Sequence, residues 1–181
     1  MERNMTRIAL FAALIAALGL IPSLMLASGI PITAQSLGVM LAGAVLGARR
    51  GALAVLLFMA LVALGLPLLA GGRGGLGAFV APTSGFFLGW PVAAFVIGLI
   101  VERWRTGALA VTVAIASVIG GIVVMYAFGI VGMSITLGKT LAECAMLVTA
   151  YVPGDLIKAV LAGLITQALA RSRPTSVLSR Q

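Results

Sequence analysis

The sequence predicts an all-α integral membrane protein with six transmembrane helices. Of its 181 residues, 62% are hydrophobic and only 9% are charged, whereas roughly 25% of the residues in a soluble domain are charged. The mean hydropathy of the whole chain is +1.23. Because a transmembrane helix needs about 20 apolar residues, six spans with short connections take up the sequence. We therefore expect a single transmembrane domain over residues 1–181, with a short polar tail at 171–181.

The residue types exclude most forms of catalysis. Histidine is absent, which excludes histidine general bases, haem ligation and histidine zinc sites. The single cysteine, Cys144, permits no intrachain disulfide and no CxxC motif. The acidic residues are too scattered in sequence to suggest a carboxylate pair or a cluster of metal ligands: Glu2, Glu102, Glu143 and Asp155. We therefore expect no enzyme, no metal site and no cofactor.

Three apolar segments make up the first half of the chain. The run Ile8–Ala27 is the first span, because its 20 residues exceed the 7 to 15 of a signal-peptide core. Gly19 and Pro22 are candidates for a bend in it. The second segment, Leu37–Ala48, is short for a span and needs the preceding loop to complete it. Gly51–Ala70 is the third span, and it opens into a glycine-rich segment.

The second half contains three more predicted spans. Phe86–Val101 is the fourth and Gly107–Val131 the fifth. The mixed segment Gly132–Val152 carries charged residues in a weak helical pattern, so we expect a loop with a short helix there. The last span runs over Pro153–Ala170, because proline is favoured at the first position of a helix.

The basic residues predict the orientation in the lipid bilayer. Nine of the twelve fall at the termini and in the even-numbered connections: Arg3, Arg7, Arg49, Arg50, Arg103, Arg105, Arg171, Arg173 and Arg180. Only Arg73, Lys139 and Lys158 lie towards the other side. The positive-inside rule then predicts a multi-pass plasma-membrane protein with both termini in the cytoplasm. It also explains the net charge of +8 without a nucleic-acid partner. The two longest polar connections face outward, where they are candidate walls of a ligand site.

Two motifs resemble nucleotide-binding sequences but lack the required context. GRGGLG at 72–77 matches GxGxxG, yet membrane spans flank it instead of a strand and a helix. An outward loop whose glycines allow close backbone approach explains it better. GMSITLGKT at 132–140 has five residues between its glycines where a P-loop has four, and it faces the wrong side for ATP. Energy for active transport must therefore come from a partner or an ion gradient.

Small residues recur at four-residue spacing in three places. They are Ala9, Ala13 and Ala17; Gly43, Gly47 and Gly51; and Gly85 with Gly89. This spacing lines one helix face with side chains that let another helix approach closely. For Gly43 to Gly51 we expect internal packing. For the alanines of the first span, internal packing and contact with another protein are both open.

Asp155 and Lys158, within PGDLIK, are the most informative charged residues. A charge at the centre of a membrane helix costs about 2.5 to 3.5 kcal/mol, and residues three apart lie on one helix face. The pair either neutralises itself near the outer end, where lysine reaches the interface, or forms the polar floor of an outward cavity. We favour the cavity, with Lys158 meeting a carboxylate and Asp155 accepting hydrogen bonds from ligand N–H groups, because ionisable residues inside membranes are functional candidates.

Three segments of the sequence resemble the BioY family, the biotin-binding S components of energy-coupling factor (ECF) transporters. They are PITAQSLGVMLAGAVLGARRG at 31–51, GRGGLGAFVAPTSGFFLGWPVAA at 72–94 and PGDLIK at 153–158. The resemblance implies an S-component fold of six helices, with outward loops capping a biotin pocket. It implies biotin uptake driven by a partner transmembrane coupling protein and ATPase subunits. It further implies that the coupling protein docks on Ala9, Ala13 and Ala17.

The resemblance also assigns candidate site residues. By motif position, Phe79, Thr83 and Phe86 match loop residues that enclose the bicyclic ring of biotin. Asp155 and Lys158 match the polar ligand contacts. The sequence departs from the family pattern at four positions, where glycine, glycine, tyrosine and proline are usual: Ala81, Ser84, Phe86 and Ala150.

Other classes of protein fit the residues less well. An ion-driven secondary transporter often shows inverted repeats, and no clear repeat relates residues 1–90 to 91–181. A membrane enzyme needs a nucleophile with a base, or a metal centre, and a scaffold leaves Asp155 and Lys158 unexplained. A pocket with aromatic walls and one cation suits biotin. It suits other small amphiphilic carboxylates equally, so the choice of biotin rests on the resemblance.

Overall fold

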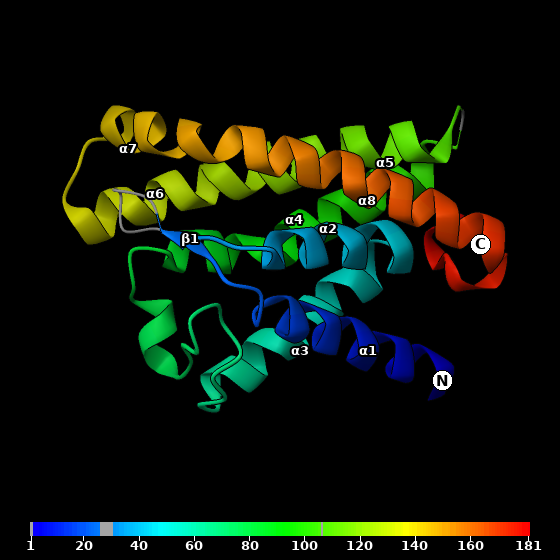
Figure 1. The fold of residues 1–181 in the computed structure, drawn as a ribbon, viewed down its shortest axis with the longest axis horizontal. Coiled ribbons are helices and arrows are strands. Elements are labelled where there is room, and N and C mark those ends of the chain that lie inside the picture. Colours follow the sequence, from blue (N-terminus) through cyan, green and yellow to red (C-terminus); the bar gives the residue numbers. More distant parts are fainter. Residues whose placement is uncertain (1, 26–30, 106) are drawn as a thin grey trace.

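The chain forms α-helices joined by short connections, with one pair of two-residue strands (Figure 1). The structure, a computed structural model, describes residues 2–25, 31–105 and 107–181. The principal elements, in chain order, are α1 (Glu2–Leu18), β1 (Leu24–Met25), β2 (Pro31–Ile32), α2 (Gln35–Leu46), α3 (Ala48–Ala63), α4 (Ser84–Arg103), α5 (Leu109–Val118), α6 (Met125–Leu137), α7 (Leu141–Val148) and α8 (Val152–Ser172). The strands β1 and β2 pair antiparallel.

Two pairs of helices join end to end, so the described residues contain six helical stretches. A π-helical turn, Ile119–Val124, links α5 and α6 into a stretch of 29 residues. A 3-10 turn, Thr149–Tyr151, links α7 and α8 into a stretch of 32 residues. Together with α1 to α4, these stretches confirm the predicted all-α fold and its six helices.

The six stretches differ in length. The helix α4, the α5–α6 stretch and the α7–α8 stretch are each long and apolar enough to cross a membrane. By contrast, α1, α2 and α3 contain 17, 12 and 16 residues. At 1.5 Å per residue, α2 is about 18 Å long, well short of a hydrocarbon core of about 30 Å. Both α2 and α3 pack against α4, so the short helices lie beside a full-length span.

The first helix ends earlier than predicted. The sequence suggested a span to Ala27 with a bend near Gly19 and Pro22, but α1 ends at Leu18. Gly19 approaches the backbone carbonyl of Leu68 so closely that a Cβ at this position would clash with it. The chain therefore leaves the helix at the glycine instead of bending within it. The last two residues of the predicted span lie outside the described residues.

The third span is also shorter than predicted, because α3 ends at Ala63 and not at Ala70. Gly65 has a φ of +101°, which glycine adopts at little cost. Two residues later, Pro67 has no N–H to continue a helix. Residues 64–75 consequently form a loop, called the 64–75 loop below, and a 3-10 turn at Leu76–Phe79 follows it.

The prediction of a loop with a short helix at Gly132–Val152 was right about the short helix, which is α7, and wrong about the loop. The helix α6 continues to Leu137, and Gly138, in the left-handed backbone conformation, caps its C-terminus. The helix α7 begins at Leu141, only three residues later. Thr140 and Glu143 form a capping box: the Thr140 N–H donates to Glu143 at 2.8 Å, and the Glu143 N–H donates to the Thr140 hydroxyl at 3.3 Å. The polar residues that suggested a loop therefore begin a helix.

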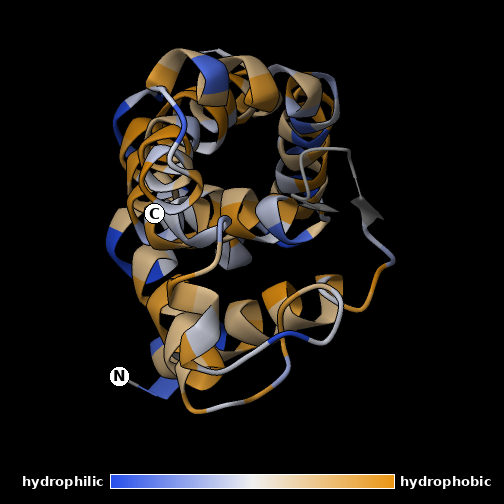
Figure 2. Ribbon diagram, turned by 90° about the vertical axis from the view of Figure 1, so that its left-hand side faces the viewer, coloured by the Kyte–Doolittle hydropathy of each residue, from blue (hydrophilic) through white to orange (hydrophobic). Residues whose placement is uncertain are grey.

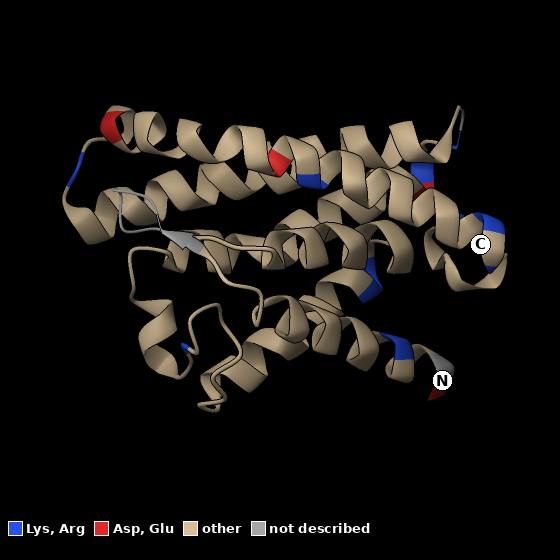
Figure 3. Cartoon of the chain, viewed as in Figure 1, with Lys and Arg blue, Asp and Glu red and all other residues tan. Residues whose placement is uncertain are grey.

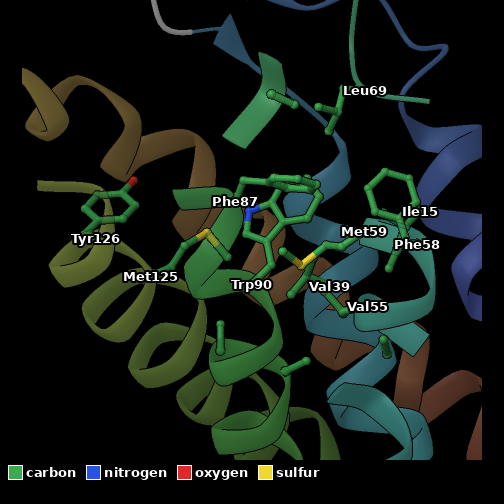
Figure 4. Packing of buried hydrophobic residues seen from close by; sticks show 14 of the residues in the cluster. Ile15, Val39, Val55, Phe58, Met59, Leu69, Phe87, Trp90, Met125 and Tyr126 are labelled. Carbon is green, nitrogen blue, oxygen red and sulfur yellow. The ribbon is translucent and has the colours of Figure 1, made fainter. Parts of the chain in front are cut away.

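Glycines bring α4 into close contact with its neighbours. Gly43 of α2 lies against the carbonyl of Ala94 in α4, so the expected internal packing of the glycines at 43, 47 and 51 is confirmed. Gly85 of α4 meets Gly132 of α6, backbone against backbone. Aromatic rings fill the adjoining space, with Phe58 of α3 stacked on Trp90 of α4 at a centroid distance of 5.9 Å (Figure 4).

The face of α1 that carries Ala9, Ala13 and Ala17 is exposed in the single chain. On the other face, Ala12 and Ile15 are buried, at 2% and 0% exposure. The helix thus packs on α2 and α3 through one side only. In a view along the long axis, apolar colours predominate on helices throughout the molecule (Figure 2), as expected for a chain surrounded by lipid.

The C-terminal residues fold back onto the end of the bundle where both termini lie (Figure 1). Arg7 of α1 donates to the carbonyl of Thr175 at 2.9 Å, and Ser179, which is fully buried, donates to the carbonyl of Ala44. Burial, with a smaller contribution from the nearby Arg105, lowers the pKa of the Arg180 guanidinium. The expected polar tail is therefore a packed segment, and the Lys and Arg residues gather mainly at this end (Figure 3).

Candidate ligand-binding site

A pocket of about 710 Å³, including its opening, lies between α2, α4, α6 and the start of α8. The 64–75 loop contributes Leu69 and Arg73 to its wall, and the strand β2 contributes Ile32. Figure 4 shows Leu69 on the loop above Phe87 and Trp90 of α4, with Met125 and Tyr126 of α6 to one side. Segments distant in sequence thus meet around one space.

The polar floor of the pocket is a hydrogen-bonded network centred on Asp155. Lys158 Nζ donates to Asp155 Oδ1 at 2.8 Å and to Ser36 Oγ at 2.9 Å. Tyr126 donates its hydroxyl to Asp155 Oδ2 at 2.6 Å, and Ser36 Oγ lies 3.3 Å from Asp155 Oδ1. Three elements, α2, α6 and α8, therefore hold one carboxylate. Lys158 keeps one of its three donors, and Asp155 keeps acceptor capacity for a ligand.

Local sequence places this carboxylate at the start of α8. Pro153 occupies the first turn of the helix, where a missing N–H has no cost. Asp155 follows in the same turn, where the helix dipole favours a negative charge. Lys158 is three residues further on and therefore lies on the same face. The 3-10 turn before α8 separates this charged turn from the apolar α7.

Aromatic side chains of α4 and α6 form the apolar walls. Phe87 and Trp90 lie edge to face with centroids 5.3 Å apart, and Phe86 meets Tyr126 in a similar arrangement at 5.9 Å. Spacing along α4 puts Phe86 and Trp90 one turn apart, so both reach the pocket. Tyr126 belongs to both parts of the site, because its ring joins the wall and its hydroxyl joins the polar floor.

The five predicted site residues do not all line the pocket. Thr83, Phe86, Asp155 and Lys158 do. Phe79 is half-buried in the 3-10 turn, with its ring 5.1 Å from that of Phe87, so it supports the wall from behind.

Gln35 is a site residue that sequence reasoning missed. Its side chain is 1% exposed and makes three hydrogen bonds. Nε2 donates to the carbonyls of Ile15 and Leu68 at 3.1 and 3.0 Å, and Oε1 accepts from the Ala70 N–H at 3.0 Å. Gln35 thereby fastens the 64–75 loop to the end of α1 and the start of α2. The available signal was a polar Gln-Ser pair at the start of an otherwise apolar helix.

Arg73 adds a second cation to the pocket. The sequence had indicated Lys158 alone. Arg73 stands on the 64–75 loop, and its Nε donates to the carbonyl of Ala70 at 3.1 Å. Its side chain is otherwise available to a ligand, because no other hydrogen bond joins it to the described residues. Within those residues, no group of three or more metal-ligating side chains occurs. The arrangement suits an amphiphilic anion: aromatic walls, one buried carboxylate and two cations.

Comparisons with known proteins show the family of this chain. The sequence profile of the BioY family matches residues 2–175. The "Biotin transporter BioY" of Rhodobacter capsulatus is 54% identical over 99% of this chain and 100% of its own, and that of Rhizobium etli is 51% identical over 92% of each chain. A crystal structure of the S-component for biotin from an ECF-type ABC transporter matches with a TM-score of 0.89 and 29% identity, over 94% of this chain and 92% of that one. This chain therefore belongs to the BioY family.

Proposed function

We propose that this chain is the biotin-binding S component of an ECF transporter, and that it imports biotin together with a coupling protein and ATPase subunits. The observation that carries the proposal is a pocket with aromatic walls and a charged floor, in a chain that is 54% identical to a biotin transporter. The chain is a transport subunit and not an enzyme. It binds its ligand without changing it chemically.

The pocket matches the parts of biotin one by one. The bicyclic ring has apolar faces, which fit against Phe86, Phe87 and Trp90. The ureido N–H groups find an acceptor in Asp155, which retains free lone pairs. The carboxylate, at the other end of biotin, requires a cation, and the pocket offers two candidates: Lys158, which has one donor left, and Arg73 on the 64–75 loop. Thr83 lines the same wall and offers a hydroxyl to the ligand.

Two further features support the proposed docking face and orientation. Ala9, Ala13 and Ala17 form an exposed face of small side chains, which a helix of the coupling protein can approach closely. The basic residues gather mainly at the end of the bundle that carries both termini (Figure 3), and by the positive-inside rule this supports a cytoplasmic location for that end. The chain thus lies in the plasma membrane with its pocket loops facing outward.

Titration of the detergent-purified chain with biotin tests this function. We expect one-to-one binding by calorimetry, with a change in tryptophan fluorescence because Trp90 lines the pocket. Mass spectrometry should recover the biotin unchanged. Folded protein that binds no biotin would contradict the proposal. Binding of another small amphiphilic carboxylate such as lipoate, in preference to biotin, would assign the chain to that ligand.

A further inference from the structure

A second groove lies at the end of the bundle that carries both termini. It measures about 910 Å³ including its opening, and it forms where the α2–α3 turn meets the last two turns of α4. Arg49, Arg50 and Arg103 line it together with Glu102, and Phe95 and Leu99 complete its apolar side. The groove shares no lining residue with the biotin pocket.

The three arginines have no hydrogen bond or ion pair to any described residue. By contrast, Arg7 and Arg105 at the same end each donate to a backbone carbonyl of the C-terminal segment. The carboxylate of Glu102 is already engaged, because its Oε1 accepts from the Ala48 N–H at 2.9 Å. The groove therefore holds a net charge of +2 with three guanidinium groups whose donors are unused.

An exposed apolar stripe on α4 leads into this group of arginines. Leu88, Val92, Phe95 and Leu99 follow one another at intervals of four, three and four residues, which places them on one helix face. Leu88, Val92 and Phe95 are 49%, 39% and 40% exposed. From Leu88 to Leu99 the helix rises about 16 Å, close to half of a hydrocarbon core of about 30 Å. The stripe thus has the length of one leaflet.

We propose that this groove binds an anionic phospholipid. Its phosphate lies between Arg49, Arg50 and Arg103, since a guanidinium presents paired donors that match phosphate oxygens. One acyl chain follows the stripe along α4. Basic pockets at the ends of membrane helices bind anionic head groups in this way. The proposal does not depend on the identity of the transported ligand.

Native mass spectrometry of the full chain tests the proposal with two lipids, phosphatidylglycerol and phosphatidylcholine. We expect the purified chain to retain phosphatidylglycerol at least about tenfold better, because this lipid carries a net negative charge that the arginines attract, whereas phosphatidylcholine carries no net charge. Arg50→Gln/Arg103→Gln should reduce retention to that of phosphatidylcholine. The matched control Arg171→Gln/Arg173→Gln removes the same charge at the same end and should change retention less than about twofold.

Three outcomes would overturn the proposal. One is equal retention of the two lipids by the unaltered chain. Another is an equal loss in both double variants, which would mean diffuse attraction to a basic surface. The third is displacement of the lipid by sn-glycerol 3-phosphate at the same concentration, which would mean a soluble phosphate site. The thermal midpoint of each variant without lipid shows that it is folded, and Arg50→Lys/Arg103→Lys, which keeps the charge, should keep most of the lipid preference.

Discussion

Tyr126 shows how one residue can serve two parts of a site. Its ring lies against Phe86 and its hydroxyl donates to Asp155 Oδ2 at 2.6 Å. Tyr126→Phe keeps the ring and removes only the donor. We expect the affinity for biotin to fall about tenfold, because a hydrogen bond to a charged group contributes about 1.5 to 3 kcal/mol and Asp155 loses one of its positions of support. Calorimetry measures the loss, and an unchanged affinity would show that Ser36 and Lys158 alone hold the carboxylate.

The two cations of the pocket make separable predictions. Lys158→Ala should weaken the binding of biotin by about 1.5 to 3 kcal/mol. It should weaken the binding of a carboxyl-amidated analogue much less, because the analogue has no carboxylate to pair with the lysine. Equal losses of affinity for both ligands would indicate a structural ion pair with Asp155.

Lys158 and Asp155 lie 2.8 Å apart, whereas the ureido group and the carboxylate are at opposite ends of biotin. Arg73→Ala therefore belongs in the same experiment. If Arg73→Ala lowers the affinity for biotin but not for the amidated analogue, and Lys158→Ala lowers both equally, the carboxylate binds Arg73.

Residue types alone located part of the site. PGDLIK was recognisable because two charges in an apolar span stand out. Gln35 and Tyr126 were not, because a glutamine at a helix start and a tyrosine in an apolar helix are common as packing and capping residues. Their importance comes from contacts with residues 20 to 35 positions away, such as Leu68 and Asp155. Arg73 was visible in the sequence, but its place in the pocket depends on how the 64–75 loop folds.

At the scale of elements, the helices were predictable from apolar runs and their ends were not. The turn at Gly19 ends α1 because another part of the chain approaches it, which the local sequence does not reveal. The capping box at Thr140 and Glu143 is a local signal for the start of a helix, although Glu143 suggested a loop by its charge. The four-residue spacing of the glycines at 43, 47 and 51 correctly predicted internal packing, but it did not identify α4 as the helix that Gly43 approaches.

The exposed face of α1 gives a prediction with an internal control. Ala13→Trp should hold the coupling protein away, so transport in cells that contain the ECF module should fall sharply. Biotin binding by the purified chain should stay near that of the unaltered protein, because Ala13 is exposed in the single chain. Ala12→Trp, one position away, should instead destabilise the fold, since Ala12 is 2% exposed and packs in the core. Loss of binding in Ala13→Trp would mean that this face is internal packing.

At the scale of the whole molecule, the C-terminal segment fastens one end of the bundle. Leu178 packs with Leu46 and Ala54, and Ser179 bonds the carbonyl of Ala44. Deletion of residues 174–181 should therefore lower the free energy of unfolding by about 1.5 to 3 kcal/mol for the buried leucine alone. Biotin affinity should persist, because none of these residues lines the pocket. Thermal unfolding and calorimetry of the shortened chain measure both quantities, and an unchanged midpoint would show that the segment contributes nothing to stability.

Gln35 has a thermodynamic consequence beyond holding a loop in place. It bonds the carbonyl of Ile15 in α1, the helix proposed to dock on the coupling protein, and with the same amide it bonds Leu68 in the pocket loop. If biotin shifts the loop, the shift acts on α1 through this one side chain. Linkage is reciprocal: a factor by which biotin changes the affinity for the coupling module equals the factor by which the module changes the affinity for biotin. Such a connection gives the transporter a means to tell a loaded subunit from an empty one. If the coupling module prefers the loaded subunit, docking by itself tightens the hold on the vitamin by the same factor, and release then needs the energy of the ATPase subunits.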